Sequence, residues 1–169
     1  MEKAMKPAVY TEEASDQMEL ETHLFFLCTQ VVYRRNSLLQ DALRALEILP
    51  TEYRILSAVL RKGPLTMQEL AQWTAYERTR ITRILHAMVA RGWIARSSAA
   101  HDKRAVLVQI TESGRAMFAA AKVIVDQVTA QAMCDNSETE IAQLKHGLGI
   151  LRKKLMQMEG GQPAEASSL

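Results

Sequence analysis

Arginine, whose side chain binds phosphates and the edges of DNA bases, is concentrated in one short stretch of this chain. Residues 77–91 contain four arginines and a single acid, Glu77. One arginine on a helix could be an ordinary solvated residue. Four of them beside one carboxylate instead favour a surface that faces a polyanion.

Hydrophobic spacing predicts an amphipathic helix over residues 77–91. At about 100° per residue, its apolar side chains fall together on one side, namely Ile81, Ile84, Leu85 and Met88. The opposite side carries residue types that contact guanine edges, thymine methyl groups and phosphates. The candidate DNA contacts of this helix are Arg78, Thr79, Arg80, Thr82, Arg83 and His86. We expect His86 to meet a phosphate or solvent rather than a base, because it lies one turn deeper.

A second group of cations lies between two predicted strands, residues 93–97 and 105–110. This polar connection ends in Lys103 and Arg104. A flexible basic tip beside a recognition helix can reach a phosphate or the adjacent minor groove. Asp102 could orient the Arg104 guanidinium through a bidentate pair, could form the turn, or could do both.

The elements that must position these residues follow one order: helix, helix, short helix–turn–helix, hairpin, helix, helix. The hydrophobic periodicity predicts helices over about 15–50, 52–62, 66–73, 77–91, 111–133 and 137–158. Thr51 and Thr111 are expected N-caps, and Gly92 is an expected C-terminal glycine. Capping boxes are predicted for Thr66 with Glu69 and for Ser137 with Glu140.

This order predicts a mainly α fold with a small β-hairpin wing, a winged helix-turn-helix flanked by N- and C-terminal dimerisation helices. The apolar residues of 141–158 recur with the spacing of a coiled-coil seam. We therefore divide the chain into a disordered tail (1–14), a dimerisation helix (15–50), a DNA-binding lobe (51–110), C-terminal dimerisation helices (111–158) and a second disordered tail (159–169).

Composition sets limits on the class of protein. The 169 residues are 48% hydrophobic and 24% charged, which is ordinary for a soluble globular protein. The net charge of +2 combines a basic middle, +6 over residues 51–105, with flanks of −3 and −1. No apolar run approaches the ~18 residues of a membrane span, and the start lacks a secretory apolar stretch, so we expect a cytoplasmic protein without a membrane partner.

Side chains for metal or redox chemistry are few and scattered. The two cysteines lie far apart, and the four histidines show no ligand spacing. The sequence also has no nucleophile elbow, glycine-rich phosphate loop or pair of carboxylates on a shared face. We therefore expect no catalytic residues, no metal, no cofactor and no enzymatic activity.

Several short motifs carry a resemblance to a known family. In order and spacing, Gly92-Trp-Ile-Ala-Arg96, Asp102-Lys-Arg104 and Ile110-Thr-Glu-Ser-Gly114 strongly resemble the MarR family of bacterial regulators, as do residues 65–71 and 78–83. The resemblance covers about residues 20–158. Thr74 and Tyr76 depart from it, because family members often carry apolar residues before the recognition helix.

The resemblance implies a homodimer whose N- and C-terminal helices intertwine and which binds double-stranded DNA. It implies recognition helices in successive major grooves and wing arginines in the minor groove. It further implies release from DNA by small aromatic acids or by cysteine oxidation, and repression as the commoner mode of regulation. The resulting prediction is a DNA-binding transcriptional regulator that recognises an inverted-repeat operator.

Arg35 interrupts the apolar stripe of the first predicted helix, close to the direction of Cys28 and Ala42. A guanidinium in that position is costly unless it is paired. It could form a structural ion pair with the partner subunit or the last helices, or it could clamp an anionic aromatic effector. A ligand that displaces an internal partner would combine the two.

Other residues could belong to an effector or redox site. Cys28 could be an oxidant sensor activated by the nearby Arg35, although a buried free cysteine is usually only a small apolar residue. Val31 lies on the same stripe, and Tyr53 and Trp73 could form walls of a pocket, but buried aromatic residues need no ligand. A winged-helix adaptor that binds proteins is the remaining alternative, against which the arginines of 78–83 argue.

Overall fold

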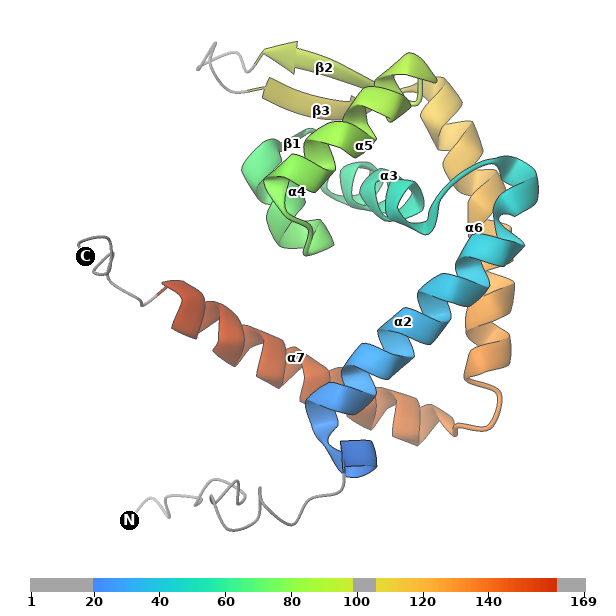
Figure 1. Cartoon of the computed structure of the whole chain (residues 1–169), viewed down its shortest axis with the longest axis vertical. Helices are drawn as coiled ribbons and strands as arrows, with labels where there is room; N and C mark the ends of the chain where they lie inside the picture. The colour runs from blue at the N-terminus through green and yellow to red at the C-terminus, as the bar shows by residue number, and fades with distance from the viewer. Residues whose placement is uncertain (1–19, 99–105, 161–169) are drawn as a thin grey trace. The chain divides into compact units, whose positions relative to one another are not determined.

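The computed structural model describes residues 20–98 and 106–160, and the chain divides into two compact units, the first ending at Val128 and the second beginning at Thr129. The fold is mainly α with a small antiparallel sheet, as predicted (Figure 1). The elements are η1 (Leu20–Thr22), α2 (Leu24–Ala42), η2 (Arg44–Leu46), α3 (Pro50–Lys62), β1 (Leu65–Thr66), α4 (Met67–Thr74), α5 (Arg78–Ala90), β2 (Ile94–Ser98), β3 (Val106–Ile110), α6 (Glu112–Ala132) and α7 (Glu138–Gly160).

The sheet has three strands in the order β1-β3-β2, and both pairings are antiparallel. The β2–β3 register runs from Ile94 opposite Ile110 to Ser98 opposite Val106. The prediction of a two-stranded hairpin missed β1, which pairs Leu65 with Val108. Two residues are too short to show a strand period, so the sequence offered no signal for it.

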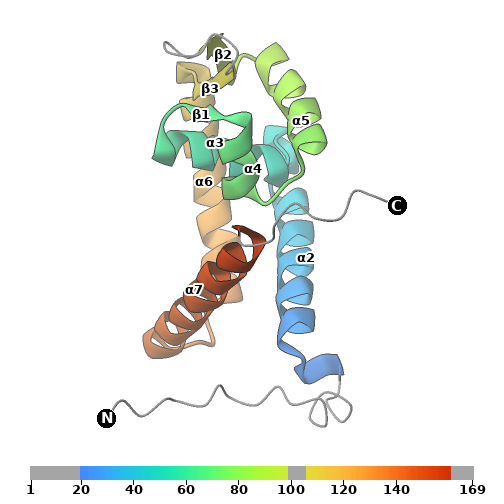
Figure 2. The ribbon, with the colours of Figure 1, turned by 90° about the vertical axis from the view of Figure 1, so that its left-hand side faces the viewer.

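The hydrophobic core of the first unit joins α2, α3, α4, α5 and β3. Its fully buried side chains include Leu39, Leu43, Ile55, Leu56, Leu70, Ile81, Leu85, Met88 and Val108. Figure 2 shows α3 and α4 between the sheet and α2, with α5 beside them. The predicted apolar side of residues 77–91 is confirmed as the side that packs into this core.

The end of the first helix was predicted wrongly. α2 ends at Ala42 rather than near residue 50, and the chain then turns through η2 to Glu47, which is left-handed with φ +51°. This turn lets Leu43 and Ile48 both reach the core, which one continuous helix could not do. The early end of the helix is determined by tertiary packing, which cannot be predicted from local hydrophobic periodicity.

The start of the second helix was also predicted wrongly. Pro50 occupies its first turn, and Glu52 rather than Thr51 caps it: the Leu49 amide donates to the Glu52 carboxylate at 2.8 Å. Proline suits this position because it lacks the amide hydrogen that a first turn leaves unbonded.

The other predicted caps are confirmed. The Thr66 amide donates to the Glu69 carboxylate at 2.8 Å, and hydrogen bonds from the backbone and hydroxyl of Thr66 lower the pKa of Glu69. Ser137 and Glu140 repeat this arrangement at the start of α7, where hydrogen bonds from the hydroxyl and backbone of Ser137 lower the pKa of Glu140. Gly92 follows α5 with φ +71°.

The second unit contains the end of α6 and the whole of α7, which continues to Gly160 and so exceeds the predicted end at residue 158. The predicted tail of 1–14 and residues 161–169 of the second tail lie outside the described residues. Among residues 20–98 and 106–160, no helix has the length and apolarity needed to cross a membrane. The division of the chain into dimerisation and DNA-binding segments stays a prediction.

Two of the sequence motifs, residues 92–96 and 110–114, are hydrogen-bonded to each other where the wing meets α6. The Thr111 amide donates to the Trp93 carbonyl at 3.1 Å, and its hydroxyl donates to the Gly92 carbonyl at 2.6 Å. The Thr111 hydroxyl also accepts the Gly114 amide at 3.0 Å. Gly114 lies so close to the start of β2 that a Cβ there would lie 2.0 Å from the Trp93 carbonyl oxygen and 2.9 Å from Ile110 Cγ1. Glycine is therefore required at this position.

We predict that Gly114→Ala lowers the free energy of unfolding by about 1–3 kcal/mol or more, because the methyl group overlaps the Trp93 carbonyl and forces the packed backbone to shift. Urea denaturation followed by circular dichroism measures the loss. Ser113→Ala, on the exposed neighbour in the same helical turn, is the matched control and should change stability by no more than about 0.5 kcal/mol. Equal stability of the two variants would contradict the packing described here.

Candidate nucleic-acid interface

The candidate recognition surface is the outward side of α5. Ile81, Leu85 and Met88 are fully buried on the inner side. The residues predicted to contact DNA are all exposed on this helix: Arg78, Thr79, Arg80, Thr82, Arg83 and His86. The Thr82 hydroxyl donates to the Arg78 carbonyl at 2.9 Å within the helix. The structure thus places these side chains together where a large partner can reach them.

The positive charge of this surface is not neutralised within the described part of the chain. Across residues 20–98 and 106–160, none of Arg78, Arg80 and Arg83 forms an ion pair. Glu77 is exposed at the N-cap, and its side chain makes no capping hydrogen bond. The amide groups at a helix N-terminus add further partial positive charge. The first turn of α5 therefore presents an electrostatic site for an anion.

The turn before α5 is well packed despite its two polar residues. Thr74 is 1% exposed, and its hydroxyl donates to the Leu70 carbonyl at 2.6 Å. Ala75 then adopts a left-handed conformation with φ +56°, which ends α4. Thr74 and Tyr76, which depart from the usual apolar residues here, are therefore compatible with an ordinary helix–turn–helix.

Tyr76 contacts two guanidinium groups. The Arg80 Cζ lies 4.6 Å from the centre of the Tyr76 ring, and the Arg54 Cζ lies 5.2 Å from it. Arg54 also donates to the Thr74 carbonyl at 3.3 Å. Arg54 was missed at the level of sequence, because its partners lie on a distant part of the chain and no local spacing reveals the contact.

The opposite end of α5 is held by Arg91. Its guanidinium lies 3.5 Å from the Glu52 carboxylate and donates to the Glu47 carbonyl at 2.7 Å. It also lies 4.9 Å from the centre of the Trp93 ring. Arg91, unlike the arginines of the first turns, is thus engaged within the protein.

The wing is described only at its base. β2 and β3 are paired up to Ser98 and Val106. The predicted tip residues Asp102, Lys103 and Arg104 lie outside the described residues. Their assignment to the minor groove stays a prediction.

A second polar cluster surrounds the hydroxyl of Tyr53, whose ring stacks on Phe118 at 5.1 Å between centroids. Burial raises the pKa of this hydroxyl, Asp126 adds to the rise, and Lys122, Arg61 and Arg35 oppose it. Lys122 and Asp126 form an ion pair with each other. Arg35 is half-buried and forms no ion pair among the described residues. Arg35, one of the predicted pocket residues, thus acts electrostatically on Tyr53, with the smallest effect of the four charged groups.

The other predicted effector residues lie in different surroundings. Cys28 is half-buried and lines a shallow depression with Thr29, Val32 and Tyr33, none of which is a cation. Val31 is 64% exposed, and Trp73 is 45% exposed with the Lys62 ammonium 4.1 Å from its ring centre. The apolar stripe of the first helix is thus largely accessible in a single subunit.

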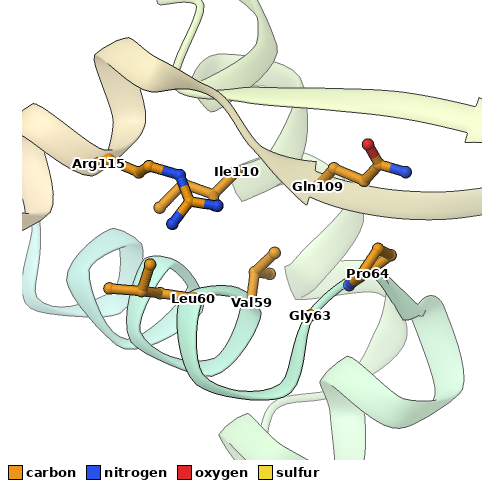
Figure 3. Close-up of a pocket in the computed structure, with 7 residues that line it drawn as sticks. All are labelled: Val59, Leu60, Gly63, Pro64, Gln109, Ile110 and Arg115. Carbon is orange, nitrogen blue, oxygen red and sulfur yellow. The ribbon is translucent and has the colours of Figure 1, made fainter.

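A small cleft lies between α3, β3 and the start of α6 (Figure 3). Arg115 extends over it, opposite Leu60 and Val59. The cleft has a volume of 140 Å³, which is below the roughly 300–1,000 Å³ of ligand pockets. In the described part of the chain, no three His, Cys, Asp or Glu side chains are grouped as metal ligands.

Comparisons with known proteins agree with this geometry. A family model described as "MarR family" matches residues 46–105. The multiple antibiotic resistance protein MarR of Escherichia coli is 28% identical over 130 residues, which span 76% of this chain and 88% of that protein. The organic hydroperoxide resistance transcriptional regulator of Bacillus subtilis is 26% identical over 146 residues, 86% of this chain and 98% of that regulator.

Solved structures give the same result. A probable transcriptional regulator from Pseudomonas aeruginosa superposes with a TM-score of 0.70 at 26% identity, covering 79% of this chain and 99% of its own. A mutant MarR from E. coli, crystallised in complex with operator DNA, superposes with a TM-score of 0.69 at 26% identity, covering 76% of this chain and 92% of its own.

Proposed function

The chain belongs to the MarR family of transcriptional regulators, and from this premise we propose that it binds an inverted-repeat operator as a homodimer through α5 and the wing. The observation that carries the proposal is the exposed side of α5, where three arginines have no carboxylate partner in the described chain. The operator complex of the E. coli relative supports the same use of this fold.

Unpartnered apolar surface supports the dimer. On α7, Leu144, Leu148, Leu155 and Met158 are each at least 40% exposed, and together with the half-buried Leu151 they recur at three- and four-residue steps. On α2, Leu24, Leu27, Val31 and Leu38 are exposed in the same way. Apolar stripes of this length mark protein interfaces, and the α7 spacing is that of a coiled-coil seam.

We predict that the protein is a stable dimer at micromolar concentration and that Leu148→Glu makes it a monomer, because a carboxylate in the seam loses its water without gaining a partner. Light scattering measures the mass of each. Lys153→Glu, on the opposite side of α7, introduces the same carboxylate outside the seam and should remain dimeric. A monomeric wild type would contradict the proposal.

A base-reading role for Arg83 has a distinct signature. Selection of bound duplexes from a random library should return an inverted repeat with half-site centres about one helical turn, ~10 bp, apart. Arg83→Ala should weaken binding to the selected site by about 1–3 kcal/mol and relax the preference at one position of each half-site. Equal weakening on selected and random duplexes would instead assign Arg83 to the backbone.

The wing should behave differently. Arg104→Ala should weaken binding nearly evenly across sequences, since a minor-groove arginine reads width and charge more than base identity. Arg44→Ala, an exposed arginine paired with Asp41, serves as the control for both variants. Unchanged affinity of Arg104→Ala at physiological salt would contradict the wing assignment.

We further propose that a small aromatic anion bound at Arg35 and Tyr53 releases the protein from DNA. Lys122 and Asp126 pair with each other, whereas Arg61 and Arg35, which also lower the pKa of the Tyr53 hydroxyl, form no ion pair among the described residues. The half-buried ring of Tyr53, which stacks on the buried ring of Phe118, offers an apolar surface. A carboxylate on an aromatic ring matches both features.

Oxidation of Cys28 is the second candidate signal. The resemblance to a hydroperoxide-resistance regulator over 86% of the chain favours it, whereas the uncharged lining around Cys28 does not. Titration of operator binding with peroxide, in wild type and Cys28→Ser, separates it from the effector proposal. Release by peroxide in wild type alone would support the redox signal.

The effector proposal predicts that Arg35→Ala keeps the dimer and DNA binding but loses release by hydroxybenzoates, because a ligand shifts an equilibrium only through unequal affinity for its two states. DNA binding and thermal unfolding are measured with and without ligand. Arg34→Ala, the exposed neighbour, is the matched control. If Arg35 is instead a structural ion pair with the partner subunit, its removal costs about 3–5 kcal/mol and the weakened variant still responds.

A further inference from the structure

Tyr76 lies in the turn between α4 and α5 and is half-buried against the core. Its ring is within 5.2 Å of two guanidinium carbons, Arg80 from the first turn of α5 and Arg54 from α3. The electron-rich face of an aromatic ring attracts cations, so one side chain can hold two like charges near each other.

Neither arginine is neutralised in the described part of the chain. Across residues 20–98 and 106–160, no carboxylate pairs with Arg54 or Arg80. Arg54 is further fixed by its hydrogen bond to the Thr74 carbonyl at 3.3 Å. Two oriented cations without a counter-charge, beside a helix N-terminus, form a site suited to an anion.

We propose that Arg54 and Arg80, positioned by Tyr76, bind the phosphate backbone of DNA. The proposal rests on the DNA binding proposed above and adds α3 to the interface. The contact with Tyr76 draws the Arg80 guanidinium back toward the turn that precedes α5. Arg83, one turn farther along, makes no such contact with any described residue, so its side chain stays available to contact bases. Arg80 and Arg54 therefore contribute affinity without sequence preference.

A duplex of about 30 base pairs and mixed sequence tests the proposal without knowledge of the operator. Its affinity is measured by fluorescence anisotropy over a range of salt concentrations. Arg54→Gln should reduce the slope of log K against log salt by about 0.9 for each phosphate that the variant no longer binds, or about 1.8 for a dimer bound through both subunits. Arg44→Gln, which removes an exposed arginine paired with Asp41, is the control for a general loss of charge.

Tyrosine variants test positioning separately from charge. Tyr76→Phe retains the ring and should bind like wild type. Tyr76→Leu retains both arginines and an apolar side chain, and should weaken binding about two- to fivefold for each released guanidinium. In the Arg54→Gln background, Tyr76→Leu should have a smaller effect, because one of its partners is already gone. A purely packing role would lower the melting temperature without this dependence on Arg54.

The outcomes separate the two proposals. Failure of the wild type to bind the duplex would overturn DNA binding itself. Wild-type binding, with Arg54→Gln matching Arg44→Gln in both affinity and salt slope, would overturn the phosphate contact. The Arg54→Gln comparison does not depend on the folding of Tyr76→Leu, so it decides the matter by itself.

Discussion

A single buried carboxylate, Glu52, fixes the geometry on which the proposed DNA-binding surface depends. It is 2% exposed, and burial of a charged group is costly unless its hydrogen bonds are satisfied. Here the Leu49 amide donates to it at 2.8 Å, and the Arg91 guanidinium lies 3.5 Å away. Because the same carboxylate caps α3 and meets the residue that ends α5, the start of one helix and the end of the other are held at one point.

The Arg91 contacts extend this constraint in both directions along the chain. Its hydrogen bond to the Glu47 carbonyl reaches the left-handed turn that follows α2, and its contact with Trp93 reaches the start of the wing. The wing is in turn locked to α6 by Thr111 and Gly114. A displacement of α2 relative to α5 must therefore either carry Arg91 with it or break these contacts. These contacts would connect an effector proposed to bind beside α2 with the proposed recognition helix α5.

The features that the sequence predicted correctly are those that local spacing encodes. The Thr66 and Ser137 capping boxes involve residues three apart, and the buried side of α5 follows from helical periodicity. The cap of α3 was missed although Leu49 and Glu52 are only three residues apart, but most of the other errors and omissions involve partners that are distant in sequence. The early end of α2, the β1 strand and the contacts of Arg54 with Tyr76 depend on how elements meet, and no local pattern reports that.

The structure distinguishes two kinds of cation in the basic middle of the chain, which the net charge alone could not separate. Some of its cations act within the protein, as Arg91 does on Glu52 and Lys62 on the Trp73 ring. Arg78, Arg80 and Arg83, which have no carboxylate partner in the described chain, lie in the first turns of α5, and Arg54 contacts Tyr76 in the turn before it. Long-range attraction of a polyanion depends on the total charge, whereas its orientation depends on where the uncompensated charge lies. Internal pairing at one end of α5 therefore leaves the uncompensated charge at the other end, where we propose that DNA binds.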